Sequence, residues 1–477
     1  MPNSDRFASE RAGLARLLPR RKRYEADIAD ATVVEESKLK RAVVGAGLGN
    51  AVEWYDFGVY AYSASVISQV FFPPNSSQGV RLIATFAAFT AAFVIRPVGG
   101  FILGPLGDKV GRQRVLAETI IMMAIGTLGI GLIPSYATIG ILAPVLLLIC
   151  RLLQGFSTGG EYGGATTFIA EHSPDRRRGF MGSWLEFGTL GGFVLGASMY
   201  TLLAAVLAPE QLVSWGWRIP FLLAGPLGMI GLYMRLKLQE TPVYQEQEKQ
   251  RGQHEQQGFW RVFAQHWRAV LICIGLVLVF NVTDYMLLSY MPTFLTERRG
   301  LSYEHGLLLL IVVMIIMMIT ITFGGRLSDR FGRRPVLFAG CIGFLVLSWP
   351  AVQLIRAPSS WLVFGGLLVL GLALVTFTST MPATLPAMFP PGIRYGSVAI
   401  AFNVSVSLFG GTVPLVAQSL ISATGDDNVV AYYLIGAAAI GLVAVYLTKE
   451  TAQQPMPESP PTITKKEQQG QLERDPG

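Results

Sequence analysis

Twelve long apolar segments recur along the chain and constrain its fold more than any other feature. Each approaches or exceeds about 20 residues, the length that a helix needs to cross the hydrocarbon core of a bilayer. Six lie in the first half, near residues 42–65, 81–106, 115–134, 138–169, 180–207 and 217–236. Six more lie near residues 268–291, 305–327, 335–355, 361–389, 396–421 and 430–447. The segments predict an all-α membrane protein with twelve transmembrane helices.

Composition indicates that lipid, and not water, surrounds most of this chain. Hydrophobic residues make up 51% of the 477 residues and charged residues only 14%, whereas soluble domains average about 25% charged. A mean hydropathy of +0.46 is too high for a single soluble core, because such cores stop growing at about 250 to 300 residues. These values exclude a soluble enzyme.

Cysteine and histidine usage argues against a metal or cofactor site. Cys150, Cys273 and Cys341 lie in apolar runs without a CxxC pair, and the four histidines fall in predicted loops or at helix ends. Disulfide frameworks and zinc sites need closely spaced sets of these residues. We therefore expect no disulfide, no metal and no cofactor.

Lysine and arginine are distributed unevenly between the two sides of the predicted membrane. The two tails and the even-numbered connections hold 31 of the 38, and the other connections hold five. The positive-inside rule then places both termini in the cytoplasm. The net charge of +7 accordingly reports orientation, and we expect no nucleic-acid partner.

These patterns predict five regions along the chain. The N-terminal stretch has no apolar h-region close to Met1, so we interpret it as cytoplasmic and not as a cleaved signal peptide. The last residues are rich in proline, glutamine and charge, which is typical of disorder. The regions are a cytoplasmic N-terminal extension (1–40), an N-terminal six-helix bundle (41–236), a cytoplasmic middle loop (237–267), a C-terminal six-helix bundle (268–448) and a disordered cytoplasmic tail (449–477).

An internal repeat indicates that the two bundles are related. The loop from Gly104 to Arg112 recurs 221 residues later as the loop from Gly325 to Arg333. Arg178, after the fourth segment, likewise recurs 216 residues later as Arg394, after the tenth segment. Corresponding positions in two halves are typical of transporters built from structural repeats. We predict that charges of these loops form a cytoplasmic gate between the halves, with solvated loop charges as the alternative; the residues are Asp108, Arg112, Asp329 and Arg333.

The paired loops on a plan of six plus six helices resemble the major facilitator superfamily of secondary transporters, over about residues 38–450. Three further runs are similar to its metabolite:proton symporter family, namely Gly49-Asn-Ala-Val-Glu53-Trp54, Arg151-Leu-Leu-Gln154-Gly155 and Ser173-Pro-Asp-Arg-Arg-Arg178-Gly179. The resemblance implies two pseudo-symmetric bundles, alternating access and location in a bacterial inner membrane, surrounded by lipid.

Within that family, the run from Trp215 to Phe221 is most similar to members that import osmoprotectants. The resemblance therefore implies import of a small zwitterionic osmolyte, proline or glycine betaine, together with protons. It also implies that the protein is not an enzyme. Nothing in the sequence specifies an oligomer, and a monomer is compatible with it.

Ionisable side chains inside the apolar segments are the candidate coupling residues. A charge at mid-helix costs about 2.5 to 3.5 kcal/mol in a bilayer unless it is paired or hydrated. Glu53 and Asp56 share a helical face, and two neighbouring carboxylates do not both ionise easily in a low dielectric. Arg151 keeps its proton and needs a carboxylate of the protein or of the substrate. We predict roles in proton coupling or substrate contact, with local pairing as the alternative, for Glu53, Asp56, Arg151, Glu161, Asn281 and Asp284.

Aromatic residues near mid-span suit a quaternary ammonium group, which offers no N–H donor and binds through cation–π contacts. We predict a substrate cage formed by Trp54, Tyr55, Tyr285 and Phe402, with simple packing as the alternative.

The sequence leaves other cargoes and activities open. A proton symporter of an organic anion, such as a dicarboxylate or an aromatic acid, would use Arg151 or Arg96 to bind the carboxylate. A membrane-embedded enzyme lacks support, because no Ser-His-Asp set, metal-ligand cluster or phosphate loop lies near the spans. A channel or a sensor that transports nothing is a further alternative.

Overall fold

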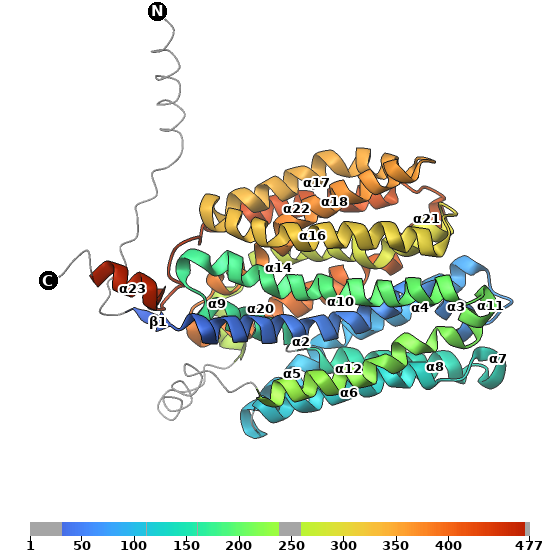
Figure 1. Cartoon of the computed structure of the whole chain (residues 1–477), viewed down its shortest axis with the longest axis horizontal. Coiled ribbons are helices and arrows are strands. Elements are labelled where there is room, and N and C mark those ends of the chain that lie inside the picture. Colours follow the sequence, from blue (N-terminus) through green and yellow to red (C-terminus); the bar gives the residue numbers. More distant parts are fainter. Residues whose placement is uncertain (1–30, 111, 160, 238–258, 473–477) are drawn as a thin grey trace, which may run out of the picture.

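The computed structural model describes residues 31–110, 112–159, 161–237 and 259–472, and consists almost entirely of long helices packed side by side (Figure 1). The N-terminal half contains α2 (Glu36–Tyr62), α3 (Ala64–Phe71), α4 (Gln78–Val94), α5 (Arg96–Val110), α6 (Arg112–Leu132), α7 (Tyr136–Ile139), α8 (Leu142–Ser157), α9 (Glu161–His172), η2 (Asp175–Arg177), α10 (Arg178–Val206), α11 (Pro209–Gln211), η3 (Leu212–Gly216) and α12 (Arg218–Lys237).

The C-terminal half contains α14 (Phe259–Asp284), η4 (Tyr285–Tyr290), α15 (Met291–Glu297), α16 (Tyr303–Phe331), α17 (Arg333–Arg356), α18 (Ser360–Thr378), α19 (Met381–Thr384), η5 (Pro386–Met388), α20 (Pro391–Ser405), η6 (Val406–Gly410), α21 (Val413–Thr424) and α22 (Val429–Leu447). Outside the two halves lie strand β1 (Thr32–Val34), strand β2 (Thr462–Thr464) and helix α23 (Lys465–Leu472).

The helices account for the twelve predicted crossings. Among the described residues, nine helical stretches are long and apolar enough to cross a membrane, and Glu118–Leu132 and Arg218–Ile230 are shorter apolar helices. Helix α2 completes the set, and its hydropathy is lowered by the polar residues Asn50, Glu53 and Asp56. Several crossings consist of consecutive helices. The break after α18 is followed by Pro382 and Pro386, which cannot donate backbone hydrogen bonds.

Helix α10 packs against both halves. It packs against α2 in its own half and against α16 in the other, as the middle layer of Figure 1 shows. Close packing on α2 depends on two glycines of α10. A Cβ added at Gly188 would lie 2.1 Å from the carbonyl oxygen of Gly47, and one added at Gly192 would lie 2.3 Å from that of Ala51.

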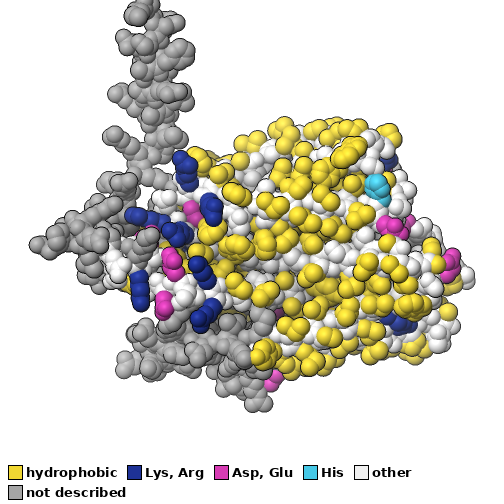
Figure 2. Space-filling model, viewed as in Figure 1, with side chains coloured by type: hydrophobic (Ala, Val, Ile, Leu, Met, Phe, Trp, Pro, Cys, Tyr) yellow, Lys and Arg dark blue, Asp and Glu magenta, His cyan; other side chains and the backbone are white. Residues whose placement is uncertain are grey.

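The long side of the molecule that faces the viewer in Figure 2 is mostly hydrophobic. Trp361, Met229 and Val206 are 84%, 73% and 72% exposed, and apolar surface of this extent requires a nonpolar environment. Lysine and arginine side chains gather at the end of the molecule that carries β1 and α23 (Figure 2). We call this end the terminal face and the opposite end, which carries α3, α11 and α21, the far face.

The C-terminal tail differs from the sequence-based expectation of disorder over residues 449–477. Residues 449–472 follow a defined path on the terminal face, and β2 pairs in parallel with β1 in the register Val33↔Ile463. Composition did not predict this order, because the tail's hydrogen-bond partners lie on distant parts of the chain.

Parts of three predicted regions lie outside the described residues. These parts are positions 1–30 of the N-terminal extension, positions 238–258 of the middle loop and the last five residues of the tail. Helix α14 begins at Phe259, inside the predicted middle loop, and α2 begins at Glu36, inside the predicted extension.

Candidate functional site

Two polar residues link Arg151 to Asp56 inside the N-terminal half. Arg151 Nη1 donates to Gln154 Oε1 at 2.8 Å, and Gln154 Nε2 donates to Thr127 Oγ1 at 2.6 Å. Thr127 Oγ1 in turn donates to Asp56 Oδ2 at 2.9 Å. The predicted arginine and carboxylate are therefore connected through Gln154 and Thr127. All four side chains are buried.

Aromatic rings surround the Arg151 guanidinium. Its central carbon lies 4.2 Å from the ring centroid of Tyr60 and 5.1 Å from that of Phe89. Cation–π contacts of this kind stabilise a desolvated cation. The sequence analysis expected a carboxylate as the partner of Arg151. In the structure its direct neighbours are instead neutral, namely Gln154 and the aromatic rings.

A second buried arginine lies beside an aromatic cluster between the halves. The Arg96 guanidinium lies 4.4 Å from the ring centroid of Phe93 and 4.6 Å from that of Phe57. The Phe93 and Tyr285 centroids are 5.2 Å apart, and those of Trp54 and Tyr285 are 6.0 Å apart. Because Tyr285 belongs to the C-terminal half, this cluster spans the interface.

Several donors in this cluster have no hydrogen-bond partner within the described part of the chain. They are Nε and Nη2 of Arg96, Nε1 of Trp54, the hydroxyl of Tyr285 and Nδ2 of the nearby Asn281. Buried donors are normally hydrogen-bonded, and each exception needs an explanation. A ligand with acceptor oxygens would satisfy them.

The predicted aromatic cage is only partly assembled. Trp54 and Tyr285 lie together, but Tyr55 points into the N-terminal half, where its hydroxyl donates to the Pro220 carbonyl oxygen at 3.0 Å. Successive residues of a helix point about 100° apart, so Trp54 and Tyr55 do not share a face. Phe402 stacks instead on Tyr162, with ring centroids 3.8 Å apart.

Sequence reasoning missed the residues around that stack as a unit. Tyr162 donates to Glu186 Oε1 at 2.6 Å, and Asn403 Nδ2 donates across the interface to the Gly159 carbonyl oxygen at 2.5 Å. Glu186 is 1% exposed. Glu186 could have been found from the sequence, because it is an ionisable residue inside the apolar segment 180–207. The same criterion identified Asp56 as a candidate.

The other predicted coupling residues are buried as well. Glu53 and Asp284 are 6% and 3% exposed. Glu161 accepts a hydrogen bond from Thr119 Oγ1 at 3.2 Å. Their proposed roles remain predictions.

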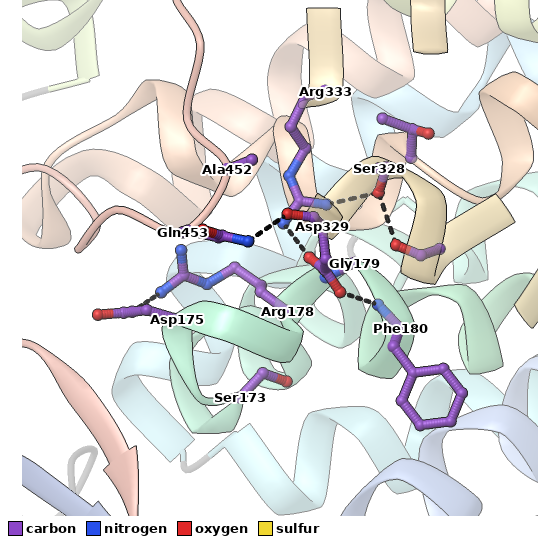
Figure 3. A network of polar contacts seen from close by, with 12 residues as sticks. Ser173, Asp175, Arg178, Gly179, Phe180, Ser328, Asp329, Arg333, Ala452 and Gln453 are labelled. Atoms are coloured by element: carbon purple, nitrogen blue, oxygen red, sulfur yellow. Dashed lines mark hydrogen bonds and ion pairs between the residues drawn. The ribbon is translucent and has the colours of Figure 1, made fainter. Parts of the chain in front are cut away.

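The predicted gate pair Asp329 and Arg333 lies where the halves meet on the terminal face (Figure 3). Asp329 accepts hydrogen bonds from Arg333 Nη2 at 3.0 Å and, across the interface, from the backbone nitrogens of Gly179 at 2.8 Å and Phe180 at 2.9 Å. Both carboxylate oxygens are thus engaged. The side chains of Asp108 and Arg112, the other predicted gate pair, lie outside the described part of the structure.

Buried arginines at the repeated positions confirm the two-fold relation between the halves. Arg178 Nε donates to the Ala170 carbonyl oxygen at 3.1 Å, and Arg394 Nε donates to the Pro386 carbonyl oxygen at 3.1 Å. Both donors and both acceptors are 216 residues apart. Arg394 also reaches the other half, because its Nη1 donates to Glu171 Oε1 at 2.7 Å.

Contacts between the halves also exist at the far face. Glu297 accepts from Ser65 Oγ at 2.9 Å and from Gln78 Nε2, both in the N-terminal half. The two halves are therefore in contact at both the terminal face and the far face.

Comparison with known proteins identifies the family. The family model described as "Sugar (and other) transporter" matches residues 42–253 and 245–461. The proline/betaine transporter of Salmonella typhimurium is 48% identical over 456 residues, which cover 94% of this chain and 91% of that protein. The chain belongs to the major facilitator superfamily.

Further relatives agree with this assignment. The glycine betaine/proline/ectoine/pipecolic acid transporter OusA of Dickeya dadantii is 46% identical, over 91% of this chain and 88% of that protein. A solved structure of the proton:xylose symporter XylE, with 18% identity, superimposes with a TM-score of 0.72 and covers 88% of this chain and 98% of that chain. This protein is thus a multi-pass transporter of a bacterial inner membrane with the twelve-helix fold, and not an enzyme.

Proposed function

We propose that this protein imports proline, glycine betaine or a similar small zwitterion together with protons by alternating access. The observation that carries the proposal is sequence identity of 46–48% over more than nine-tenths of the chain with relatives named for these solutes. The symporter fold supports proton coupling, which we propose for this chain on the basis of its buried carboxylates.

The cluster around Arg96 has the chemistry that a zwitterion needs. The donors of Arg96, Trp54 and Tyr285 that have no partner among the described residues suit a carboxylate. Aromatic faces next to them suit the ammonium group, which is secondary in proline and quaternary in glycine betaine. We propose that the substrate lies here, between α2, α5 and η4, with Asn281 as a further donor and Phe402 near its path.

Asp56 is the proposed proton carrier. Its Oδ1 has no hydrogen-bond partner within the described residues, while Oδ2 is connected to Arg151 through Thr127 and Gln154. Gain or loss of a proton at Asp56 therefore changes the net charge of this buried hydrogen-bonded group, in which Arg151 stays positive. Glu53, Glu161 and Asp284 are proposed as additional members of the coupling set.

The terminal face is the proposed cytoplasmic side. It carries both described ends of the chain and most of the visible basic side chains (Figure 2), as the positive-inside rule requires. On this assignment Asp329 and Arg333 form the cytoplasmic gate, together with Asp108 and Arg112 of the repeated loop. We propose the same five regions of the chain, with the tail ordered. We also propose that the protein works as a monomer in the lipid bilayer.

Uptake by a strain that lacks its own osmolyte transporters tests the proposal. Labelled glycine betaine should accumulate, excess proline should compete, and a protonophore should abolish accumulation. Competition by a dicarboxylate but not by glycine betaine would instead support an organic-anion symporter, for which the buried Arg96 is also suited. Accumulation that is unaffected by the protonophore would refute proton coupling.

A further inference from the structure

The tail that follows α22 crosses the terminal face from one half of the transporter to the other. We call residues 449–464 the tail strap. It leaves the C-terminal half at the end of α22 and finishes in β2, which pairs with β1. Strand β1 lies one residue before α2, the first helix of the N-terminal half. The two ends of the described chain are thus joined across the junction of the halves.

The first part of the strap is fixed to the C-terminal half. Glu450 accepts from the backbone nitrogens of Arg333 at 2.9 Å and Arg334 at 3.1 Å. Gln453 Nε2 donates to the Asp329 carbonyl oxygen at 2.7 Å, as Figure 3 shows. Later, the Pro457 carbonyl oxygen accepts from Arg394 Nη2 at 3.3 Å.

The strap is also fixed to the N-terminal half. Arg178 Nη1 donates to the Gln454 carbonyl oxygen at 3.1 Å. The backbone nitrogen of Thr462 donates to Asp175 Oδ2 at 3.2 Å, and that of Thr32 donates to the Pro461 carbonyl oxygen at 2.8 Å. Contacts with the two halves alternate along the strap, so neither half can move away without breaking some of them.

Met456 is the apolar contact at the centre of the strap. It is 4% exposed and packs with Ala170 of α9 and Ala387 of η5. These two alanines belong to different halves and occupy nearly equivalent positions in the internal repeat, 217 residues apart. A single side chain therefore lies close to the pseudo-two-fold axis and contacts both halves.

We propose that the tail strap is a releasable lock that holds the terminal face closed. Alternating access requires the halves to separate at this face once in every transport cycle. The strap contacts the C-terminal half through Gln453, the N-terminal half through the β1–β2 pair, and both halves through Met456. Separation must therefore detach it from at least one of the halves. The strap thus sets how often the terminal face opens, whichever solute is carried.

Cysteine labelling of purified protein tests the lock without any substrate. Ser183 of α10 is 0% exposed and faces the C-terminal half, because a Cβ added at Gly325 of α16 would lie 2.8 Å from its Oγ. It becomes a reporter as Ser183→Cys when C150A, C273A and C341A remove the native thiols. Its reaction rate with a maleimide measures opening of the terminal face. Met456→Glu places a charge between Ala170 and Ala387, and we expect labelling to be about ten-fold faster.

The matched control is Gln454→Glu, which adds the same charge two residues away on an exposed side chain. It should label at the rate of the parent protein. Equal labelling rates for Met456→Glu and the parent would overturn the proposal.

A milder pair of variants covers the possibility that Met456→Glu fails to fold. Gln453→Ala removes only the hydrogen bond to Asp329, and we expect labelling about two- to ten-fold faster, since one net hydrogen bond contributes about 0.5 to 1.5 kcal/mol. Gln454→Ala, which removes a side chain but leaves the carbonyl oxygen that Arg178 contacts, should have no effect. If Gln453→Ala labels at the same rate as the parent protein, the strap is not a lock. A wrong substrate assignment would leave all of these rates unchanged.

Discussion

At the scale of single residues, Asp56 is the carboxylate best placed to carry a proton. Only one of its oxygens has a hydrogen-bond partner among the described residues, and that partner, Thr127, leads to Arg151. We predict that Asp56→Asn, which cannot ionise, lowers accumulation of labelled substrate to the level of protonophore-treated wild type. Exchange of substrate across the membrane should persist, because exchange needs no net proton transfer.

Thr127→Val is the matched control, because it removes the hydroxyl between Gln154 and Asp56 but keeps the carboxylate. It should retain proton-driven accumulation at a reduced rate. Full accumulation by Asp56→Asn would show that the proton is carried elsewhere. Glu53, Glu161 and Asp284, the other buried carboxylates proposed for coupling, would then be replaced next.

Arg96 gives a prediction about affinity. If its Nε and Nη2 bind the substrate carboxylate, Arg96→Gln should raise the KM for uptake about 10- to 100-fold, because a hydrogen bond to a charged group contributes about 1.5 to 3 kcal/mol. Arg96→Lys keeps the charge but loses the planar fork and should have an intermediate KM. An unchanged KM in both variants would place the carboxylate at another residue.

At the scale of helices, glycines determine how closely the crossings approach. A Cβ added at Gly155 of α8 would lie 1.7 Å from the Ala92 carbonyl oxygen of α4, whereas one added at Gly365 of α18 would have no atom within 4 Å. We predict that Gly155→Ala destabilises the protein by about 1 to 3 kcal/mol, the usual cost of overpacking. The unfolding temperature in detergent should fall accordingly.

Gly365→Ala tests whether the loss is specific to the contact. An alanine at an uncrowded helical position is favourable by about 0.5 to 1 kcal/mol relative to glycine, so the unfolding temperature should stay the same or rise. Similar losses in both variants would contradict a packing role for Gly155.

Helices were the most predictable level of this structure. Apolar length alone located the twelve crossings, because lipid leaves the backbone no other way to satisfy its hydrogen bonds. The internal repeat paired Arg178 with Arg394, and their contacts proved equivalent. The predicted pair of Asp329 and Arg333 is also in contact.

Contacts between distant residues were less predictable. The link from Arg151 to Asp56 depends on Thr127, an ordinary polar residue that no local pattern singles out. Order in the tail depends on partners more than 100 residues away, such as Asp329 for Gln453. Patterns within one segment carry no information about such partners, since they follow from how the crossings pack.

At the scale of the whole molecule, the two ends of the interface oppose each other. Asp329 joins the halves at the terminal face, and Glu297 joins them at the far face. In alternating access only one end opens at a time, so contacts at one end favour opening at the other. Removing a contact should therefore shift the population toward the conformation that is open at the same end.

Opposite effects of two neutralising variants on the Ser183→Cys reporter test this balance. Asp329→Asn retains one acceptor oxygen for three donors and should speed labelling about three- to ten-fold. Glu297→Gln weakens the hydrogen bonds from Ser65 and Gln78 at the far face and should slow labelling about two- to five-fold, because a carboxylate is a stronger acceptor than a neutral amide. Glu304→Gln removes the same charge near the far face, in the first turn of α16, and should change nothing. Shifts in the same direction for Asp329→Asn and Glu297→Gln would mean that the two ends do not oppose each other, and that each variant simply loosens the protein.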